Sequence, residues 1–206
     1  MKISWTPPTP RPGLIGEWDK FIGPGATRTE LALILLPSLL AATAVPLYAW
    51  SQKLGWNGWQ MAVATLFALD LVGGVTTNAT TAAKRWYHRE GQGTKELLGF
   101  TAVHFLHPLL VAWLFAGGNW WYFVLSYGYL MLAAFLILRV PLYVQRPFAL
   151  LLYLGGLILT FYVLPAIPGL EWFLPIFYMK LLISHLILEA PFLPESNPSI
   201  FTKEIT

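Results

Sequence analysis

Long apolar stretches, separated by short polar turns, dominate the pattern of this chain. Six stretches approach or exceed the roughly 20 residues that a helix needs to cross the hydrocarbon of a bilayer. They cover residues 29–50, 59–82, 96–115, 120–140, 148–167 and 171–192. Strands of a membrane β-barrel would be shorter and would alternate apolar with polar positions. The pattern therefore predicts an all-α integral membrane protein built as a bundle of six transmembrane helices.

The distribution of Lys and Arg over this pattern predicts the orientation of the bundle. Basic residues precede span one, lie between spans two and three and between spans four and five, and follow span six, whereas the other connections hold only Lys53. Such residues stay on the cytoplasmic side, so we expect both termini in the cytoplasm. The predicted parts are a cytoplasmic or interfacial amino-terminal segment (1–28), the six-helix domain (29–193) and a short cytoplasmic tail (194–206). A cell (inner) membrane is the expected location.

Composition agrees with a surface that faces lipid. Hydrophobic residues make up 56% of the chain and charged residues 11%, whereas a soluble domain carries roughly 25% charged residues. The absence of cysteine excludes disulfides, Fe–S clusters and thiolate chemistry. The basic residues are scattered at loop ends, so no nucleic-acid partner is expected. The expected partners are membrane lipids and a lipophilic small molecule, and the oligomeric state is not indicated.

Asp70 interrupts the second span near its middle. At about 1.5 Å per residue it lies about 16 Å in from Trp59. An ionisable group at that depth costs about 2.5 kcal/mol or more, which makes it a functional-site hypothesis by default. Small and polar residues, Asn78 among them, follow at helical spacing on the same face. Close helix packing explains the glycines and threonines of this face but not Asp70.

Two histidines share one face of the third span. His104 and His107 are three residues apart, and Pro108 follows directly. Because proline lacks an amide hydrogen, the carbonyl of His104 loses its helical partner, and we expect the helix to kink there. The alternatives are a binding element or a purely structural kink.

The sixth span carries a further polar group. His185 and Glu189 are four residues apart and share a face with Tyr178, whereas Lys180 lies roughly 140° around the helix from His185. The non-functional alternative for Glu189 is that it is solvated by water at the cytoplasmic membrane interface. His185 lies deeper, where solvation by water is not available.

These polar groups share the slab between the midplane and the cytoplasmic side, which predicts one cavity open toward the cytoplasm or the inner leaflet. The loop after span two adds Arg85 and Trp86 below it. Membrane anchoring and capture of an anionic headgroup are both typical of such a loop.

Histidine and carboxylate together allow three chemistries. One is a zinc or iron site with His104, His107, His185 and Glu189 as ligands. The second is metal-free acid–base work by a buried carboxylic acid. The third and less favoured is haem ligation by histidines of facing helices.

We expect a membrane-embedded enzyme for a lipid, isoprenoid or quinone-like substrate, because the outer halves of the spans hold few polar residues and a one-sided cavity results. The alternatives are a small proton- or cation-coupled transporter and a binding or assembly factor without turnover. The predicted catalytic residues are Asp70, Glu189 and His185, and the predicted substrate-binding residues are Asn78, Lys180, Tyr178, Arg85 and Trp86.

Overall fold

A computed structural model describes residues 2–193 of the chain. Five helices are long and apolar enough to cross a membrane: α2 (Arg28–Ser51), α3 (Gly58–Ala79), a compound helix Thr94–Leu114, α7 (Trp120–Ile137) and a compound helix Leu142–Val163. The all-helical class is confirmed, and these helices fit a multi-pass membrane protein. The sixth predicted span is shorter, a helix over Phe173–His185.

Three of these helices change their winding along their length. The Thr94–Leu114 helix consists of α5 (Thr94–Ala102), the 3₁₀ turn η1 (Val103–Phe105) and α6 (Leu106–Leu114). The π-helix η2 (Leu159–Val163) follows α8 (Leu142–Ile158), and the π-helix η3 (Met179–His185) follows α9 (Phe173–Tyr178). The 3₁₀ turn lies just before Pro108, where the sequence predicts a kink, so the winding changes at the predicted place.

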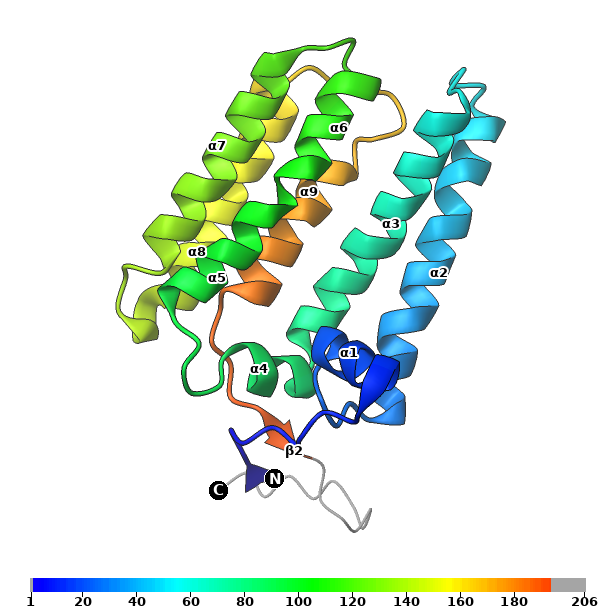
Figure 1. The fold of residues 1–206 in the computed structure, drawn as a ribbon. Coiled ribbons are helices and arrows are strands. Elements are labelled where there is room, and N and C mark those ends of the chain that lie inside the picture. Colours follow the sequence, from blue (N-terminus) through cyan, green and yellow to red (C-terminus); the bar gives the residue numbers. More distant parts are fainter. Residues whose placement is uncertain (1, 194–206) are drawn as a thin grey trace, which may run out of the picture.

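Both ends of the described chain lie at one end of the bundle. β1 (Lys2–Ile3) pairs antiparallel with β2 (Phe192–Leu193). The short helices α1 (Gly13–Ile22) and α4 (Thr81–Tyr87) lie across this same end, as Figure 1 shows. The predicted tail 194–206 falls outside the described residues. We refer to this end as the α4 end.

Polar residues at the helix starts tie neighbouring elements together. Glu30 completes the cap of α2 by accepting from the amide of Thr27, and its other oxygen accepts from the amide of Ala82 at 3.2 Å. Gln60 completes the cap of α3 in the same way, by accepting from the amide of Asn57, and its side-chain nitrogen donates to the carbonyl of Leu114 at 2.7 Å. These bonds fix α2 to α4 at one end of the bundle and α3 to α6 at the other.

The short helix formed by α9 and η3 is the core of the bundle. Six of its large side chains are at most 2% exposed: Phe173, Leu174, Phe177, Tyr178, Leu181 and Leu182. By contrast, α2 turns leucines outward, among them Leu36 and Leu40. A helix that contacts protein along its length does not have to match the thickness of the hydrocarbon, which explains why the sixth apolar segment is shorter than predicted.

Several other predicted boundaries are also wrong, among them the end of the second span and the start of the fifth. The second span ends at Ala79 rather than near residue 82, because Thr80 adopts an extended backbone and its hydroxyl caps α4 by accepting from the amide of Ala83. The fifth span begins at Leu142 rather than near residue 148. Its first turns therefore include Gln145 and Arg146, which the hydropathy pattern assigned to the preceding loop.

Candidate functional site

An ion pair between a buried lysine and a partly exposed aspartate joins α3 to η3. Lys180 Nζ donates to Asp70 Oδ2 over 2.6 Å, and His107 Nε2 lies 3.0 Å from the same oxygen. The side chain of Lys180 is 3% exposed and that of His107 is 16% exposed, whereas Asp70 keeps 36%. Within the described residues, Asp70 Oδ1 accepts no hydrogen bond. Asp70 is thus held by one oxygen and leaves the other open.

A glycine makes this contact possible. A Cβ at position 74 would lie 2.3 Å from Lys180 Cε, closer than side-chain atoms approach one another. Asp70 and Gly74 are one turn apart on the same face of α3, so the lysine stem crosses the glycine to reach the carboxylate. Lys180 itself lies in the π-helix η3, a winding found mostly as short insertions and frequently at functional sites.

His107 belongs to a stack of rings. Its ring centroid lies 4.5 Å from that of Phe67 and 5.3 Å from that of His104. His104 Nδ1 donates to the carbonyl of Phe100 at 2.7 Å, within its own helix. The Nδ1 atom of His107 is enclosed and has no partner among the described residues. The two histidines of the third span therefore play different local roles: one fixes Asp70, and the other bonds to its own backbone.

His185 continues this arrangement toward the α4 end. Its side chain is 1% exposed, its ring lies 4.1 Å from that of Phe100, and neither ring nitrogen has a partner in the part of the chain described. His88 Nε2 donates to the backbone carbonyl of His185 at 3.0 Å. The four histidines of the chain thus form a row that starts at Asp70. Phe100 lies between the pair His107 and His104 and the pair His185 and His88.

Lys84 caps the end of η3. Its Nζ donates to the carbonyls of Ser184 and Ile187, each at 2.6 Å. Burial lowers the pKa of Lys84 to about 8, although the carboxylate of Glu189 opposes that shift. Burial and the charge of Lys84 lower the pKa of the neighbouring His88 to about 4. Lys84 therefore stabilises the end of the core helix.

Arg85 and Trp86 lie on α4, beyond the last residue of α3. Arg85 is 6% exposed, its Nε is enclosed without a partner, and it forms no ion pair with any acidic group in residues 2–193. Trp86 is half-buried, and the guanidinium carbon of Arg89 lies 3.7 Å from its ring centroid. The structure places these two predicted substrate-binding residues at the α4 end, not beside Asp70.

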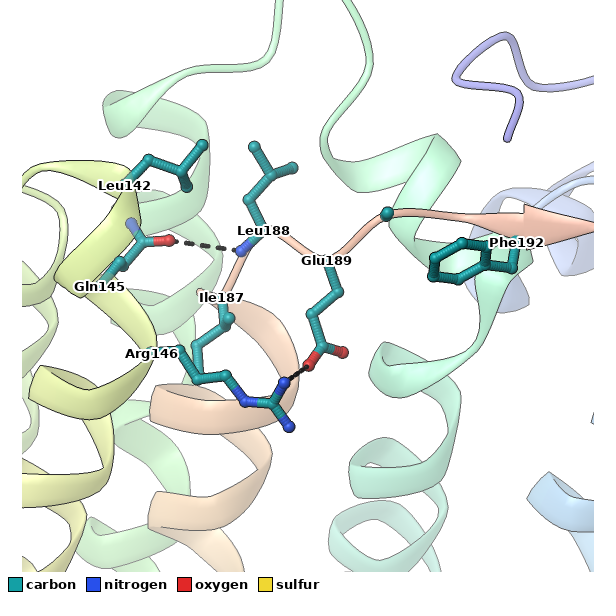
Figure 2. A pocket seen from close by; sticks show the side chains of 8 residues that line it. Leu142, Gln145, Arg146, Ile187, Leu188, Glu189 and Phe192 are labelled. Carbon is teal, nitrogen blue, oxygen red and sulfur yellow. Dashed lines mark hydrogen bonds and ion pairs between the residues drawn. The ribbon is translucent and has the colours of Figure 1, made fainter. Parts of the chain in front are cut away.

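Glu189 lies apart from the histidines. Because η3 ends at His185, helical spacing does not extend to Glu189, and the predicted shared face of these two residues is not formed. Glu189 lies in a groove of about 470 Å³, and its Oε1 lies 3.8 Å from Arg146 Nη1. Figure 2 shows the two side chains next to one another. Gln145 Oε1 accepts from the amide of Leu188 in the same groove.

Tyr178 and Asn78 are both buried, in different surroundings. Tyr178 is fully buried, and its hydroxyl donates to the carbonyl of Ser126 on α7 at 3.0 Å. Asn78 is 5% exposed in the last turn of α3, and its amide nitrogen is enclosed without a partner in the described chain. Tyr178 is therefore a packing residue between α9 and α7, whereas Asn78 keeps an unused donor.

The structure does not assemble the predicted metal ligands. No three His, Asp or Glu residues in the described part of the chain are placed to hold one metal ion. His104 and His107 are neighbours, but His185 lies beyond Phe100, and Glu189 lies in the groove with Arg146. The residues that the structure brings together at Asp70 are a carboxylate, an amine and an imidazole.

The pairing of Lys180 with Asp70 and the role of Gly74 are what sequence reasoning missed. A signal exists in the chain: a glycine one turn from an intramembrane aspartate leaves room for a large partner side chain.

Searches of protein-family models, of curated proteins and of solved structures find no match to this chain.

Proposed function

We propose that this chain is a membrane-embedded enzyme that performs acid–base chemistry on a lipophilic substrate: a lipid, an isoprenoid or a quinone-like molecule. The observation that carries the proposal is the state of Asp70. Its Oδ2 is held by Lys180 and His107, while its Oδ1 is free and a third of the side chain stays exposed. A carboxylate oriented in this way can accept a proton from a bound hydroxyl or amine.

The neighbours of Asp70 suit the steps of such a reaction. Lys180 supplies a fixed positive charge that stabilises negative charge as it develops on the substrate. His107 Nε2 donates to Oδ2 and so holds the carboxylate in one orientation. Asn78, two turns further along α3, offers its unused amide donor for a polar group of the substrate. Glu189 is not part of this site, because it lies in the groove with Arg146.

The row of histidines supports a proton supply from the α4 end. A neutral imidazole accepts a proton on one nitrogen and releases one from the other. His107 and His185 keep enclosed nitrogens without partners, and buried polar atoms of this kind are commonly satisfied by internal water. In this proposal, His185 acts as a proton carrier rather than as a metal ligand.

Lipid turnover tests the proposal. Purified protein in nanodiscs is incubated with a total lipid extract of the expression host, and the lipids are compared by liquid chromatography and mass spectrometry. The variant is Asp70→Asn. The matched control is Glu17→Gln, which removes an exposed carboxylate that pairs with Lys20 on α1. Product in excess of protein from the wild type and the control, absent from Asp70→Asn, supports the enzyme.

A proton- or cation-coupled transporter is the second candidate, because intramembrane ion pairs and histidines also serve as proton relays in carriers. It requires passage through the outer half of the bundle, where Gln60 joins α3 to α6. In sealed proteoliposomes, a carrier would show a pH-gradient-driven flux that depends on Asp70, with no new lipid product. The absence of both lipid turnover and pH-gradient-driven flux would refute both candidates.

The proposed arrangement in the membrane has six crossings and cytoplasmic termini. The pairing of β1 with β2 at one end supports an even number of crossings, and α4 carries its basic residues at that same end. Because the chain has no cysteine, single cysteines can report the orientation. A membrane-impermeant maleimide added to intact cells should label Ser51→Cys and not Gln92→Cys. The reverse result would invert the topology.

A further inference from the structure

Arg85 is the one buried arginine of the described chain, and the amino-terminal segment covers it. It is 6% exposed, and its Nε is enclosed without a hydrogen-bond partner. A Cβ at Gly25 would lie 3.6 Å from Arg85 Nη2 and 2.8 Å from Pro8 Cγ. The guanidinium therefore lies under the turn that leads into α2, with only a small opening to the outside.

A guanidinium in this position requires an anion. Arginine stays charged in proteins, and a buried charge costs several kcal/mol unless it is paired. The nearby carboxylates are engaged elsewhere: Asp19 binds Arg11 at 2.6 Å, and Glu30 accepts from two backbone amides. The Arg11 guanidinium lowers the pKa of Asp19 to about 2, so this pair stays ionised at neutral pH. No carboxylate in the described residues lies within ion-pair distance of Arg85.

The adjacent residue shows that this chain does pair its buried cations where partners exist. Lys84 is 3% exposed and donates to two carbonyls at the end of η3. Arg85, next to it on the same short helix, has neither a carbonyl nor a carboxylate as a partner among residues 2–193. The difference is not one of burial, because both side chains are almost fully covered.

The helix next to Arg85 has the exposed apolar side chains of a helix that lies at a membrane surface. The helix α1, which packs on α4, leaves large apolar side chains exposed: Leu14, Ile15, Trp18 and Phe21. A helix with such a face lies in the boundary between headgroups and acyl chains. Figure 1 shows α1 and α4 together across the end of the bundle.

We infer that Arg85 is the anchor of a binding site for the phosphate group of an anionic phospholipid headgroup. Guanidinium pairs with phosphate through two parallel hydrogen bonds, and in this position it would gain the partner that the protein itself does not supply. Free inorganic phosphate shares this chemistry. The site does not depend on turnover at Asp70.

Thermal unfolding in micelles tests the site, because the effect of Arg85→Gln on the unfolding temperature should change sign when an anionic lipid is added. In micelles of neutral phosphatidylcholine and detergent, Arg85→Gln should unfold at the same temperature as the wild type or at a higher one, because an unpaired buried charge has been removed. Addition of phosphatidylglycerol should raise the midpoint of the wild type by about 5 °C, by mass action on the folded state. Arg85→Gln should not respond. Arg89→Gln, which removes the same charge four residues on, is the matched control and should respond like the wild type.

Two further arms identify the source of the anion. Inorganic phosphate at millimolar concentration replaces phosphatidylglycerol if a free anion suffices, whereas a response to the lipid alone assigns the site to a headgroup. A chain shortened to residue 193 tests whether residues 194–206 occupy the site, in which case the truncation alone would create the lipid response. An equal response of Arg85→Gln and the wild type to phosphatidylglycerol would overturn the inference, as would a lipid response confined to the truncated chain.

Discussion

Removal of either partner of the Asp70–Lys180 pair should destabilise the bundle to different degrees. Asp70→Asn leaves a lysine that is 3% exposed without its counter-ion, whereas Lys180→Met leaves a carboxylate that is 36% exposed and still bound to His107. The first change leaves the Lys180 ammonium unpaired in the core, and the second leaves the Asp70 carboxylate, which is partly exposed, without its lysine. We therefore expect Asp70→Asn to be the more costly, and the double variant to recover much of the loss.

The separation of the charges gives the scale. At 2.6 Å and an effective dielectric constant of about 20, the attraction is about 6 kcal/mol. Desolvation of the two groups offsets part of it, and breaking a buried pair by removing one partner costs about 3–5 kcal/mol. We expect that range for Asp70→Asn, about 1–2 kcal/mol for Lys180→Met, and a coupling energy of about 2–4 kcal/mol. Ordinary hydrogen bonds between membrane helices average about 0.6 kcal/mol in such cycles.

The cycle is measured by reversible unfolding in mixed micelles, followed by tryptophan fluorescence, for which the chain offers ten tryptophans. Glu17→Gln again serves as the control for loss of a carboxylate and should change the unfolding free energy by less than about 0.5 kcal/mol. Additive single effects would refute the reasoning, because the two side chains would then not interact. A larger loss for Lys180→Met than for Asp70→Asn would refute the argument from burial.

Three more changes follow from the local contacts. Gly74→Ala should destabilise the protein by about 2 kcal/mol or more in the same unfolding assay, because its Cβ would collide with the stem of Lys180. The control is Gly99→Ala, in an exposed helical position with open space, which should be neutral or stabilising by up to about 1 kcal/mol. Lys84→Met should cost about 2 kcal/mol, because two carbonyls at the end of η3 lose a charged donor. His88 has a folded pKa of about 4, below that of the unfolded chain at about 6.5, so the unfolded state binds more protons between these values. Stability should therefore fall on acidification through that window, and His88→Gln should remove about 2 kcal/mol of the loss between pH 7 and pH 5, as unfolding at the two pH values would show.

The helical class and most spans were predictable because hydropathy depends only on the local sequence. The break before Pro108 was predictable for the same reason, since a missing amide acts within one turn. The sixth span was not, because α9 is surrounded by protein and its length is set by the bundle rather than by the bilayer. Thr80 ended α3 early through a side-chain cap that apolarity does not report.

The candidate site was likewise predictable where it depends on local sequence and not where it depends on tertiary packing. Asp70 was identifiable from its depth alone. Its partner was not, because the contact between Asp70 and Lys180 depends on how η3 is placed along α3 and on the π winding of η3. Glu189 was assigned to the histidine face because helical spacing was extended past the last helical residue. The sequence thus locates ionisable groups that are costly to bury, whereas tertiary packing decides which of them are in contact.

Gly74 also bears on how relatives of this chain could change over time. Any side chain at this position would occupy the path of the Lys180 stem, so the two positions are not free to vary independently. A descendant that acquired alanine or a larger residue here would have to displace the end of the lysine side chain, or shorten or lose it, and the contact of the lysine with the aspartate would be disturbed. A replacement of residue 74 is therefore linked to a change at residue 180 or in the path of its side chain. An aspartate followed one turn later by glycine, with a lysine in the last helix, is accordingly a linked set of three positions by which distant relatives can be recognised.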